Sequence, residues 1–399
     1  MGDPHDGLPK SGWCPGTVRD AAGGIVALSL ATFLAVTTEM LPVGLLPLIG
    51  AELDISESTT GLLVTVYAFM VAALAVPLTV WTARLPRKGL LVGTLVAYTA
   101  SNVIVAVAPA FAALAAGRAV GGLAHALFFS VCIGYGARLV RPHFTGRALS
   151  LVTAGASAGF VLGVPLSTSL GTAVGWRAAF GVLAAVSALT AVLVAALLPA
   201  VAGGGGGQDD PGRGSSGARL AVVSVTNAVV YLGQYSVYTY VAVVLLAAGL
   251  SVSCVGPVLL ALGGLGLLGT WYAGVSLDRH PRASILTVLG VLALGLVALG
   301  LTFPALGGVL AAAALWGAGA GGVASVFQTA AIRTRGASPD VVGALVNSTA
   351  NVGIGAGAAL GGAVLAGPGL GSLPFVGAAL VLAGVGVVLV ARRAFPASP

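Results

Sequence analysis

The stretch LSLATFLAVTTEMLPVGLLP, residues 28–47, decides the fold class of this chain. It is long enough to cross a bilayer, because a helix needs about 20 apolar residues to span the hydrocarbon. One residue breaks the pattern, since Glu39 places a carboxylate where ionisation is most costly. We therefore interpret the run as a membrane-spanning helix that carries a functional side chain.

The composition extends this interpretation to the whole chain. Of its 399 residues, 58% are hydrophobic and 7% are charged, against roughly 25% charged residues in a soluble domain. The sequence therefore predicts an all-α membrane protein with twelve transmembrane helices, at about 22–48, 58–81, 89–108, 110–137, 147–172, 177–199, 219–247, 252–275, 284–302, 305–332, 341–367 and 372–391.

Motifs for enzyme chemistry, metals or nucleotides do not fit this setting. Cys14, Cys132 and Cys254 are scattered, the histidines lack metal-ligand spacing, and no phosphate-binding G-x-x-x-x-G-K-[ST] string occurs. The string GASAG around Ser157 matches a hydrolase elbow but lies in an apolar span. We expect no enzymatic activity, no cofactor and no metal.

The basic residues follow the ends of alternate spans. By the positive-inside rule this side is cytoplasmic, which places both termini inside. The first 21 residues contain no signal-peptide cleavage pattern, so the first span is retained. The net charge of +7 then records topology and requires no nucleic-acid partner. The residues on this side are Lys10, Arg19, Arg84, Arg87, Lys88, Arg138, Arg141, Arg147, Arg213, Arg219, Arg279, Arg282, Arg333, Arg335, Arg392 and Arg393.

A polar segment divides the chain between spans six and seven. Residues 202–219, AGGGGGQDDPGRGSSGAR, have the composition of a flexible linker. The predicted organisation is a cytoplasmic tail 1–21, a six-helix half 22–199, a cytoplasmic linker 200–218, a second six-helix half 219–391 and a cytoplasmic tail 392–399.

The two halves repeat one another in sequence. RLPRKGLL from Arg84 matches RHPRASIL from Arg279 at an offset of 195. At an offset of 194, Ser157, Gly159 and Gly163 fall on Asn351, Gly353 and Gly357. Duplicated, pseudo-symmetric halves are typical of secondary transporters, which bind their substrate between the repeats near the midplane.

Several motifs then carry a family resemblance over residues 22–391. They are TTEMLPVGLLPLI in span one, ARLPRK after span two, GRAVGGLAHALFF in span four, GVPLSTSLG in span five, GWRAAF after it, DRHPR after span eight and NSTANVGIGAG in span eleven. The chain resembles the major facilitator superfamily, in particular its drug:proton antiporter and sugar-efflux (arabinose-efflux-permease-like) branch. The resemblance implies alternating access between two six-helix halves.

The resemblance also implies a gating role for the basic loops. The second copy keeps Asp278, Arg279 and Arg282 of the family's loop motif, whereas the first has Arg84 and Arg87 without the acid. By similarity, these residues would hold one conformation shut through charge pairing. A purely topological role for these charges is an equal alternative.

Glu39 and Arg118 lie at matching depths in spans one and four. Each is about 12 Å from the outer boundary at 1.5 Å rise per residue, so an ion pair between them is geometrically possible. We interpret Glu39 as the proton carrier, with Arg118 modulating its charge. A pair that only fixes helix packing is the alternative. His125, two turns below Arg118, is either a second proton site or a neutral, hydrogen-bonded side chain.

The predicted substrate-binding face lies on spans seven and eleven. Spacings of four, three and four place polar tips on one side of span seven, and an i, i+4 pair lies in span eleven. These residues are Asn227, Tyr231, Gln234, Tyr238, Asn347 and Asn351. The span-eleven pair could instead bond between helices. Gln234 is the counterpart of Glu39 at the 195 offset.

Span five carries the residues expected to bend. Gly159, Gly163 and Pro165 surround a GVP string that resembles the antiporter motif of the family, with Val164 where a second glycine is typical. Glycine permits close packing and proline frees a carbonyl, so we expect a helix that bends during transport.

The sequence thus favours a proton-coupled exporter of drugs, antibiotics or sugars in a bacterial plasma membrane. Its expected partners are a small-molecule substrate, protons and the lipid bilayer, and we expect a monomer. A uniporter or importer of sugars or metabolites, or a membrane sensor that does not transport, are the alternatives.

Overall fold

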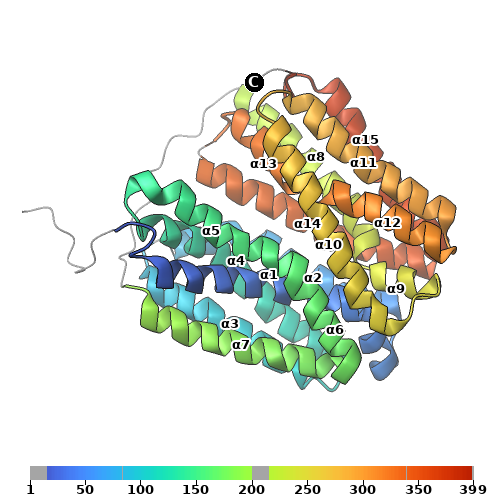
Figure 1. Cartoon of the computed structure of the whole chain (residues 1–399), viewed down its shortest axis with the longest axis horizontal. Coiled ribbons are helices and arrows are strands. Elements are labelled where there is room, and N and C mark those ends of the chain that lie inside the picture. The colour runs from blue at the N-terminus through green and yellow to red at the C-terminus, as the bar shows by residue number, and fades with distance from the viewer. Residues whose placement is uncertain (1–15, 83, 200–214, 338, 398–399) are drawn as a thin grey trace, which may run out of the picture.

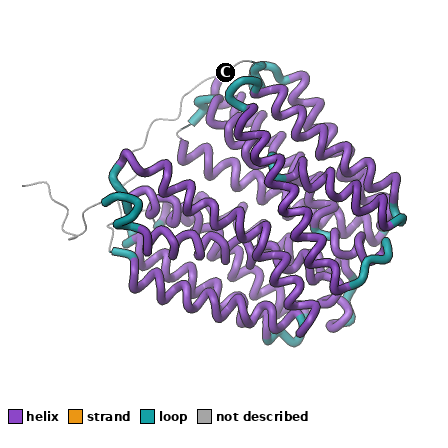
Figure 2. The backbone as a smooth tube through the Cα atoms, viewed as in Figure 1, coloured by secondary structure: helices purple, strands orange, loops and turns teal. Residues whose placement is uncertain are grey.

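The computed structural model describes residues 16–82, 84–199, 215–337 and 339–397. The N-terminal tail up to residue 15, with Cys14, and most of the predicted linker therefore lie outside the described residues. Within those ranges the chain is helical, apart from one isolated bridge between Gly16 and Val140. Figure 2 shows helices over nearly the whole described backbone, joined by short loops at the two ends.

Twelve of its helical segments are long and apolar enough to cross a membrane, as the sequence predicted. In chain order the helices are α1 (Ala22–Leu53), α2 (Glu57–Trp81), α3 (Arg87–Ala106), α4 (Phe111–Arg138), α5 (Thr145–Ala158), α6 (Val164–Val174), α7 (Trp176–Leu197), α8 (Ser215–Tyr238), α9 (Val241–Ala247), α10 (Val255–Ser276), α11 (Pro281–Thr302), α12 (Leu306–Ala320), α13 (Val323–Arg333), α14 (Pro339–Ala366) and α15 (Leu373–Val390).

Three of the spans are composite. The fifth consists of α5, a π-helical turn η2 (Gly159–Gly163) and α6. The seventh breaks between α8 and α9, and the tenth breaks between α12 and α13 at a glycine pair. Irregular backbone within a membrane span is tolerated where neighbouring helices or a cavity satisfy it. These breaks therefore mark positions where the span meets protein or water.

The helices are arranged in two side-by-side groups (Figure 1). The blue-to-green helices α1 to α7 occupy one group and the yellow-to-red helices α8 to α15 occupy the other. The groups meet where α2 packs on α14 and where α6 packs on α10. Each group has apolar residues buried in its interior.

The two groups are in contact toward the end of the molecule that carries Glu52, Asp54 and Glu57, where α1 ends and α2 begins. Thr65 of α2 donates its hydroxyl to the carbonyl of Gly355 in α14, at 3.0 Å. Nearer the same end, the Tyr240 ring fits against Gly61 of α2, where no side chain has room. The halves are therefore sealed at the acidic end.

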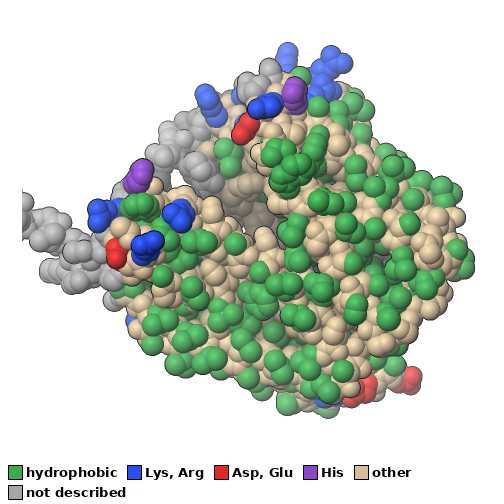
Figure 3. Space-filling view, viewed as in Figure 1, with side chains coloured by type: hydrophobic (Ala, Val, Ile, Leu, Met, Phe, Trp, Pro, Cys, Tyr) green, Lys and Arg blue, Asp and Glu red, His purple; other side chains and the backbone are tan. Residues whose placement is uncertain are grey.

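The opposite end is hollowed. Figure 3 shows a depression between the two groups, on the side where most of the visible Lys, Arg and His side chains gather, and further Asp and Glu side chains lie at the far end. The cavity described below lies between the same two groups of helices. This conformation is open at the basic end and closed at the acidic end.

Candidate functional site

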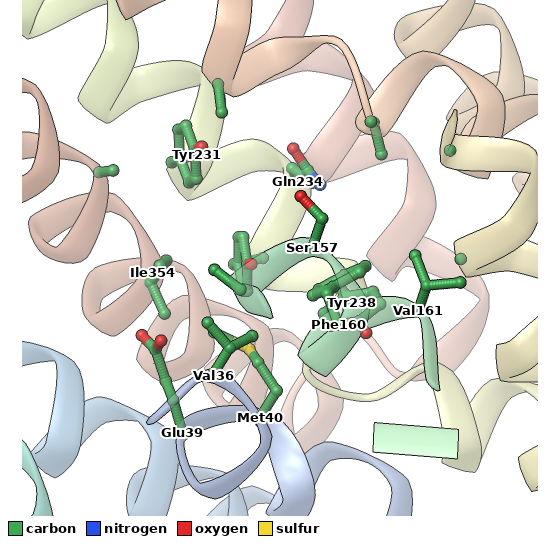
Figure 4. Close-up of a pocket in the computed structure, with 18 of the residues that line it drawn as sticks. Val36, Glu39, Met40, Ser157, Phe160, Val161, Tyr231, Gln234, Tyr238 and Ile354 are labelled. Atoms are coloured by element: carbon green, nitrogen blue, oxygen red, sulfur yellow. The ribbon is translucent and has the colours of Figure 1, made fainter. Parts of the chain in front are cut away.

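A cavity of about 420 Å³ lies between the two groups of helices. Helices α1, α4 and α5 with the turn η2 form one wall, and α8, α10, α12, α13 and α14 form the other. Figure 4 shows side chains from both walls converging on this space. Its polar lining residues are Glu39, His125, Ser157, Tyr231, Gln234, Tyr235, Tyr238, Thr270, Trp316, Asn347 and Asn351.

Glu39 lies at the edge of this cavity, on α1. It is 7% exposed and lines the space together with its neighbours Val36 and Met40 (Figure 4). Its closest ionisable neighbour is His125, whose Nδ1 lies 3.8 Å from the carboxylate. A carboxylate at such depth costs about 2.5–3.5 kcal/mol on insertion scales. The position therefore favours a group that exchanges its charge.

Arg118 is arranged differently from the predicted side-chain ion pair. Its guanidinium donates to the backbone carbonyls of Thr38 at 2.6 Å, Glu39 at 2.7 Å and Leu63 at 3.3 Å. It also lies over the Tyr67 ring, 4.1 Å from the centroid. Among the described residues, no ion pair within 4.0 Å joins it to the Glu39 carboxylate.

Pro42 explains why the Thr38 carbonyl of α1 is available to accept a hydrogen bond from another helix. Proline has no N–H, so the carbonyl of Thr38 four residues earlier loses its helical donor. The guanidinium of Arg118 supplies that donor from α4. Arg118 is itself 1% exposed and does not line the cavity. Its charge is thus held behind the cavity wall.

His125 lies on the cavity wall between these groups. Its Nδ1 is 3.0 Å from the hydroxyl of Tyr67, and its ring packs on Phe129 with centroids 4.9 Å apart. The sequence offered no acidic partner for this histidine, but the structure brings Glu39 close to it. The carboxylate and the imidazole that line the cavity are therefore neighbours.

Most of the predicted substrate-binding face does line the cavity. Tyr231, Gln234, Tyr238, Asn347 and Asn351 are all found there. The two asparagines also interact with each other, since Asn351 Nδ2 donates to the carbonyl of Asn347 at 3.0 Å. The face built from α8 therefore converges with that of α14.

Asn227 lies elsewhere. It is fully buried between α8 and α14, where its amide donates to the Val346 carbonyl and to the Thr349 hydroxyl, both at 3.0 Å. It is two turns of helix away from Gln234, which lines the cavity. This amide stabilises helix packing.

Sequence reasoning missed several lining residues. Phe160, Tyr235, Ser157 and Thr270 line the cavity, although nothing in their local pattern distinguishes them from packing residues. Trp316 also lines the cavity, whereas Tyr67 packs against Arg118 and Trp271 is 67% exposed.

The glycines of span five pack against α1. A Cβ on Gly159 would lie 2.5 Å from the Phe33 carbonyl, and one on Gly163 would overlap the Thr37 hydroxyl. Both glycines belong to the π-helical turn, and Pro165 follows at the start of α6. The predicted bending residues thus coincide with an irregular turn, a feature that often occurs at functional sites.

The second half repeats this seam at the offsets found in the sequence. A Cβ on Gly353 would lie 2.5 Å from the Ala228 carbonyl oxygen, just as a Cβ on Gly159 would lie 2.5 Å from the Phe33 carbonyl oxygen. A Cβ on Gly357 would likewise lie 2.6 Å from the Leu232 carbonyl oxygen. The repeat is therefore visible in packing as well as in sequence, and it places Glu39 and Gln234 in opposite walls of one cavity.

The predicted gating residues lie at the basic end. Asp278 forms an ion pair with Arg333 at 3.2 Å, a partner that the sequence reasoning did not name. Arg282 donates to the carbonyl of Leu389. Arg279 and Arg84 are exposed, and Arg87 is partly buried.

Comparison with known proteins agrees with this architecture. The family model described as Major Facilitator Superfamily matches residues 28–345. The chain belongs to the Major Facilitator Superfamily. As a member it is a multi-pass membrane transporter of small molecules and not an enzyme.

Curated relatives in this superfamily include efflux pumps. The chain is 34% identical over 346 residues to a chloramphenicol efflux pump of Mycobacterium tuberculosis, covering 84% of each chain. It is 28% identical over 367 residues to a probable sugar efflux transporter of Mannheimia succiniciproducens, covering 89% of this chain and 90% of that one. These relatives agree with the predicted branch.

Solved structures of the superfamily share the fold. A bacterial homologue of the human lysosomal transporter Spinster, in an inward-facing and occupied conformation, superposes with a TM-score of 0.76 at 15% identity, covering 94% of this chain and 97% of that one. The human organic anion transporter MFSD10 superposes with a TM-score of 0.66 at 18% identity, covering 93% and 99%.

Proposed function

We propose that this superfamily member is a proton-coupled exporter, which exchanges protons for a small molecule by alternating access. The observation that carries the proposal is the position of Glu39. Within the described spans it is the one acidic side chain away from the helix ends, and it lies at the cavity edge without an ion-pair partnership to Arg118. An ionisable group placed so is a candidate proton carrier.

The orientation follows from the charges. Basic residues gather at the open end, and by the positive-inside rule this end faces the cytoplasm. The protein then lies in a bacterial plasma membrane as a monomer with both termini inside, and the conformation described is inward-open. The cavity is thereby accessible to cytoplasmic substrate.

Protonation of Glu39 supplies the coupling. A neutral carboxylic acid tolerates burial in a closed, dry cavity far better than a carboxylate does. Glu39 takes a proton when the outer side is open, carries it inward as the halves rock, and releases it when water enters from the cytoplasm. Substrate binding near Glu39 and His125 favours that release.

Arg118 and His125 support this cycle in different ways. Arg118 fixes the backbone of α1 at Thr38 and Glu39, so the carboxylate keeps its position while its charge changes. His125 lies close enough to accept a proton from Glu39 through a small side-chain movement. Tyr67 contacts both Arg118 and His125, so these three side chains form one cluster.

The rocking movement uses the irregular span five and the basic loops. The turn Gly159–Gly163 with Pro165 allows α5 and α6 to change their relative direction. Asp278, Arg279, Arg282, Arg84 and Arg87 lie at the end that closes in the outward-open state. We assign these residues to gating there.

The substrates come from the class that the relatives are named for. Chloramphenicol and simple sugars are therefore the compounds to test. The residues that would contact them are Tyr231, Gln234, Tyr238, Asn347 and Asn351.

Inside-out membrane vesicles with an acidified lumen test the proposal. A pH-sensitive dye follows proton outflow as chloramphenicol or a sugar is added, in the native protein, in Glu39→Gln and in a control, Glu57→Gln, whose side chain is exposed at the start of α2, at the acidic end. We expect substrate-triggered outflow in the native protein and the control, and none in Glu39→Gln.

Two results contradict the proposal. Downhill flux of a compound without proton movement makes the protein a uniporter and reduces Glu39 to a structural residue. Unchanged, pH-dependent outflow in Glu39→Gln removes the carboxylate from coupling.

A further inference from the structure

The wall of the cavity formed by the second half contains a series of aromatic rings in contact with one another. Tyr231 and Tyr235 stack with centroids 5.8 Å apart and planes 9° from parallel. Tyr235 meets Tyr238 edge-on at 5.4 Å, and Tyr238 meets Trp316 at 5.9 Å. The wall thus presents a continuous aromatic surface to the cavity.

One ring contact crosses from half to half. Phe160, in the π-helical turn η2, stacks on Tyr238 of α8 with centroids 5.6 Å apart and an angle of 23° between the planes. Figure 4 shows the two rings side by side among the lining residues. A planar ring entering from the cavity could replace either partner, because offset-stacked rings are worth about 0.5–1.5 kcal/mol beyond their buried area.

The same wall holds polar atoms without partners. Within the described part of the chain, the indole Nε1 of Trp316, Oε1 of Gln234 and Oδ1 of Asn351 are buried and form no hydrogen bond. All three residues line the cavity. Buried polar atoms are normally paired, so unpaired ones beside a cavity indicate a ligand that brings partners. Here one donor and two acceptors remain to be satisfied.

The charges near the cavity disfavour an ionic ligand. Among the described residues that line the cavity, Glu39 is the only carboxylate, and the charge of Arg118 behind it offsets the charge of Glu39. Protonation of Glu39 leaves a net positive region, which repels a cation. The same described lining residues include no Arg or Lys to bind an anion directly.

We infer that the cavity binds an uncharged aromatic compound that carries both hydrogen-bond donors and acceptors. Its ring lies against Phe160 and Tyr238, its acceptor pairs with the Trp316 indole, and its donors pair with Gln234 and Asn351. The inference specifies the substrate class of the proposed exporter. It rests on the proposed function only where it calls the bound compound a transported substrate.

Equilibrium binding to the purified full chain in detergent, at one pH and without a gradient, tests the inference. The probes are chloramphenicol as an uncharged aromatic compound with hydroxyl and amide groups, ethidium as an aromatic cation, and arabinose as an uncharged non-aromatic sugar. A ligand that binds the folded state raises the unfolding temperature, and titration calorimetry gives its Kd. We expect stabilisation by chloramphenicol alone.

Matched variants locate the binding. Trp316→Phe keeps a ring and removes the donor, and Phe160→Leu removes the stacking partner. We expect each to raise the Kd for chloramphenicol about tenfold, the equivalent of one hydrogen bond or ring contact. The controls are Trp271→Phe and Phe375→Leu, which alter rings exposed at 67% and 43% on the outer surface, and we expect an unchanged Kd.

Binding of ethidium or arabinose as tightly as chloramphenicol overturns the inference, as does no binding of chloramphenicol or an unchanged Kd in Trp316→Phe. The proposed function fails separately. Chloramphenicol binding without proton outflow in vesicles leaves the inference intact and contradicts the proposed coupling. Proton outflow triggered by ethidium alone supports the coupling and contradicts the inference.

Discussion

The guanidinium of Arg118 donates to the backbone carbonyl of Glu39, not to its carboxylate. A side-chain ion pair would hold the carboxylate charged and close to α4. Backbone bonding instead fixes the helix and leaves the functional group at the cavity edge. Arg118 therefore acts on the backbone of α1, an arrangement that fits the proposed change of charge at Glu39.

Replacement of Arg118 by lysine tests this arrangement. A single ammonium cannot reproduce the fork that reaches Thr38 and Glu39 together, and charge-assisted hydrogen bonds are worth about 1.5–3 kcal/mol each. We expect Arg118→Lys to lower the unfolding temperature in detergent and to abolish transport. Arg393→Lys, at an exposed position, is the control and should unfold like the native protein.

If Arg118→Lys unfolds at the native temperature, the carbonyl contacts do not stabilise α1, and the role of Arg118 must be sought in its charge alone.

The symmetric positions 39 and 234 allow a transfer of the carboxylate. In the double variant Glu39→Gln, Gln234→Glu, the acid faces the same cavity from the second wall. The described helices of that half carry their cations only near the ends, so the moved carboxylate lacks an Arg118 and a His125. We expect no recovery of substrate-triggered proton outflow in vesicles. Recovery would show that the neighbours of Glu39 are dispensable for coupling.

Added methyl groups probe the glycine seams. Alanine at Gly159 or at Gly353 would press on a carbonyl of the facing helix, and overpacking costs about 1–3 kcal/mol. We expect both variants to unfold at a lower temperature, by similar amounts because the contacts are repeated. Gly134→Ala, where nothing lies within 4 Å, serves as the control. Equal stability of all three variants would mean that the seams are loosely packed.

The hydrogen bond between Thr65 and Gly355 joins the halves at the closed end. Thr65→Val keeps the shape and removes the bond, which is worth about 0.5–1.5 kcal/mol, or roughly a two- to tenfold change in a conformational ratio. We expect the outward-open population to rise, because the loss of the bond destabilises the conformation that is closed at the acidic end. The measurement is the distance distribution between spin labels placed at the two sides of the acidic end.

The control for that measurement is Thr99→Val, since the Thr99 hydroxyl bonds only within its own helix, to Leu95. Identical distance distributions in Thr65→Val and Thr99→Val would remove this bond from the closure of the outer end.

Hydropathy and charge predicted the parts of this molecule that depend on burial in lipid. The twelve spans and the isolated acid Glu39 follow from the cost of placing polar groups in hydrocarbon, which is legible in a single sequence. The repeat offset then placed Gln234 opposite Glu39, as the structure has it. These features could be predicted because they depend on long apolar segments and on charged residues that are rare in them.

The remaining features depend on how helices cross. The bond from Arg118 to a carbonyl requires both the missing N–H of Pro42 and the approach of α4 to α1. Phe160 reaches the cavity from an irregular turn, where regular helical spacing does not predict direction. Asn227 has the spacing of a cavity residue, yet it lies where α8 and α14 are in contact.

The unequal walls of the cavity suggest how such a transporter would evolve new resistance. Under the proposed coupling, changes in the first wall disturb Glu39, His125 or the seam of span five, and so threaten energy conversion or folding. Side chains such as Tyr231 and Asn347 in the second wall are free of those duties. Selection by a new antibiotic should therefore leave its first mutations among the helices after the linker, while the energy-converting half stays unchanged.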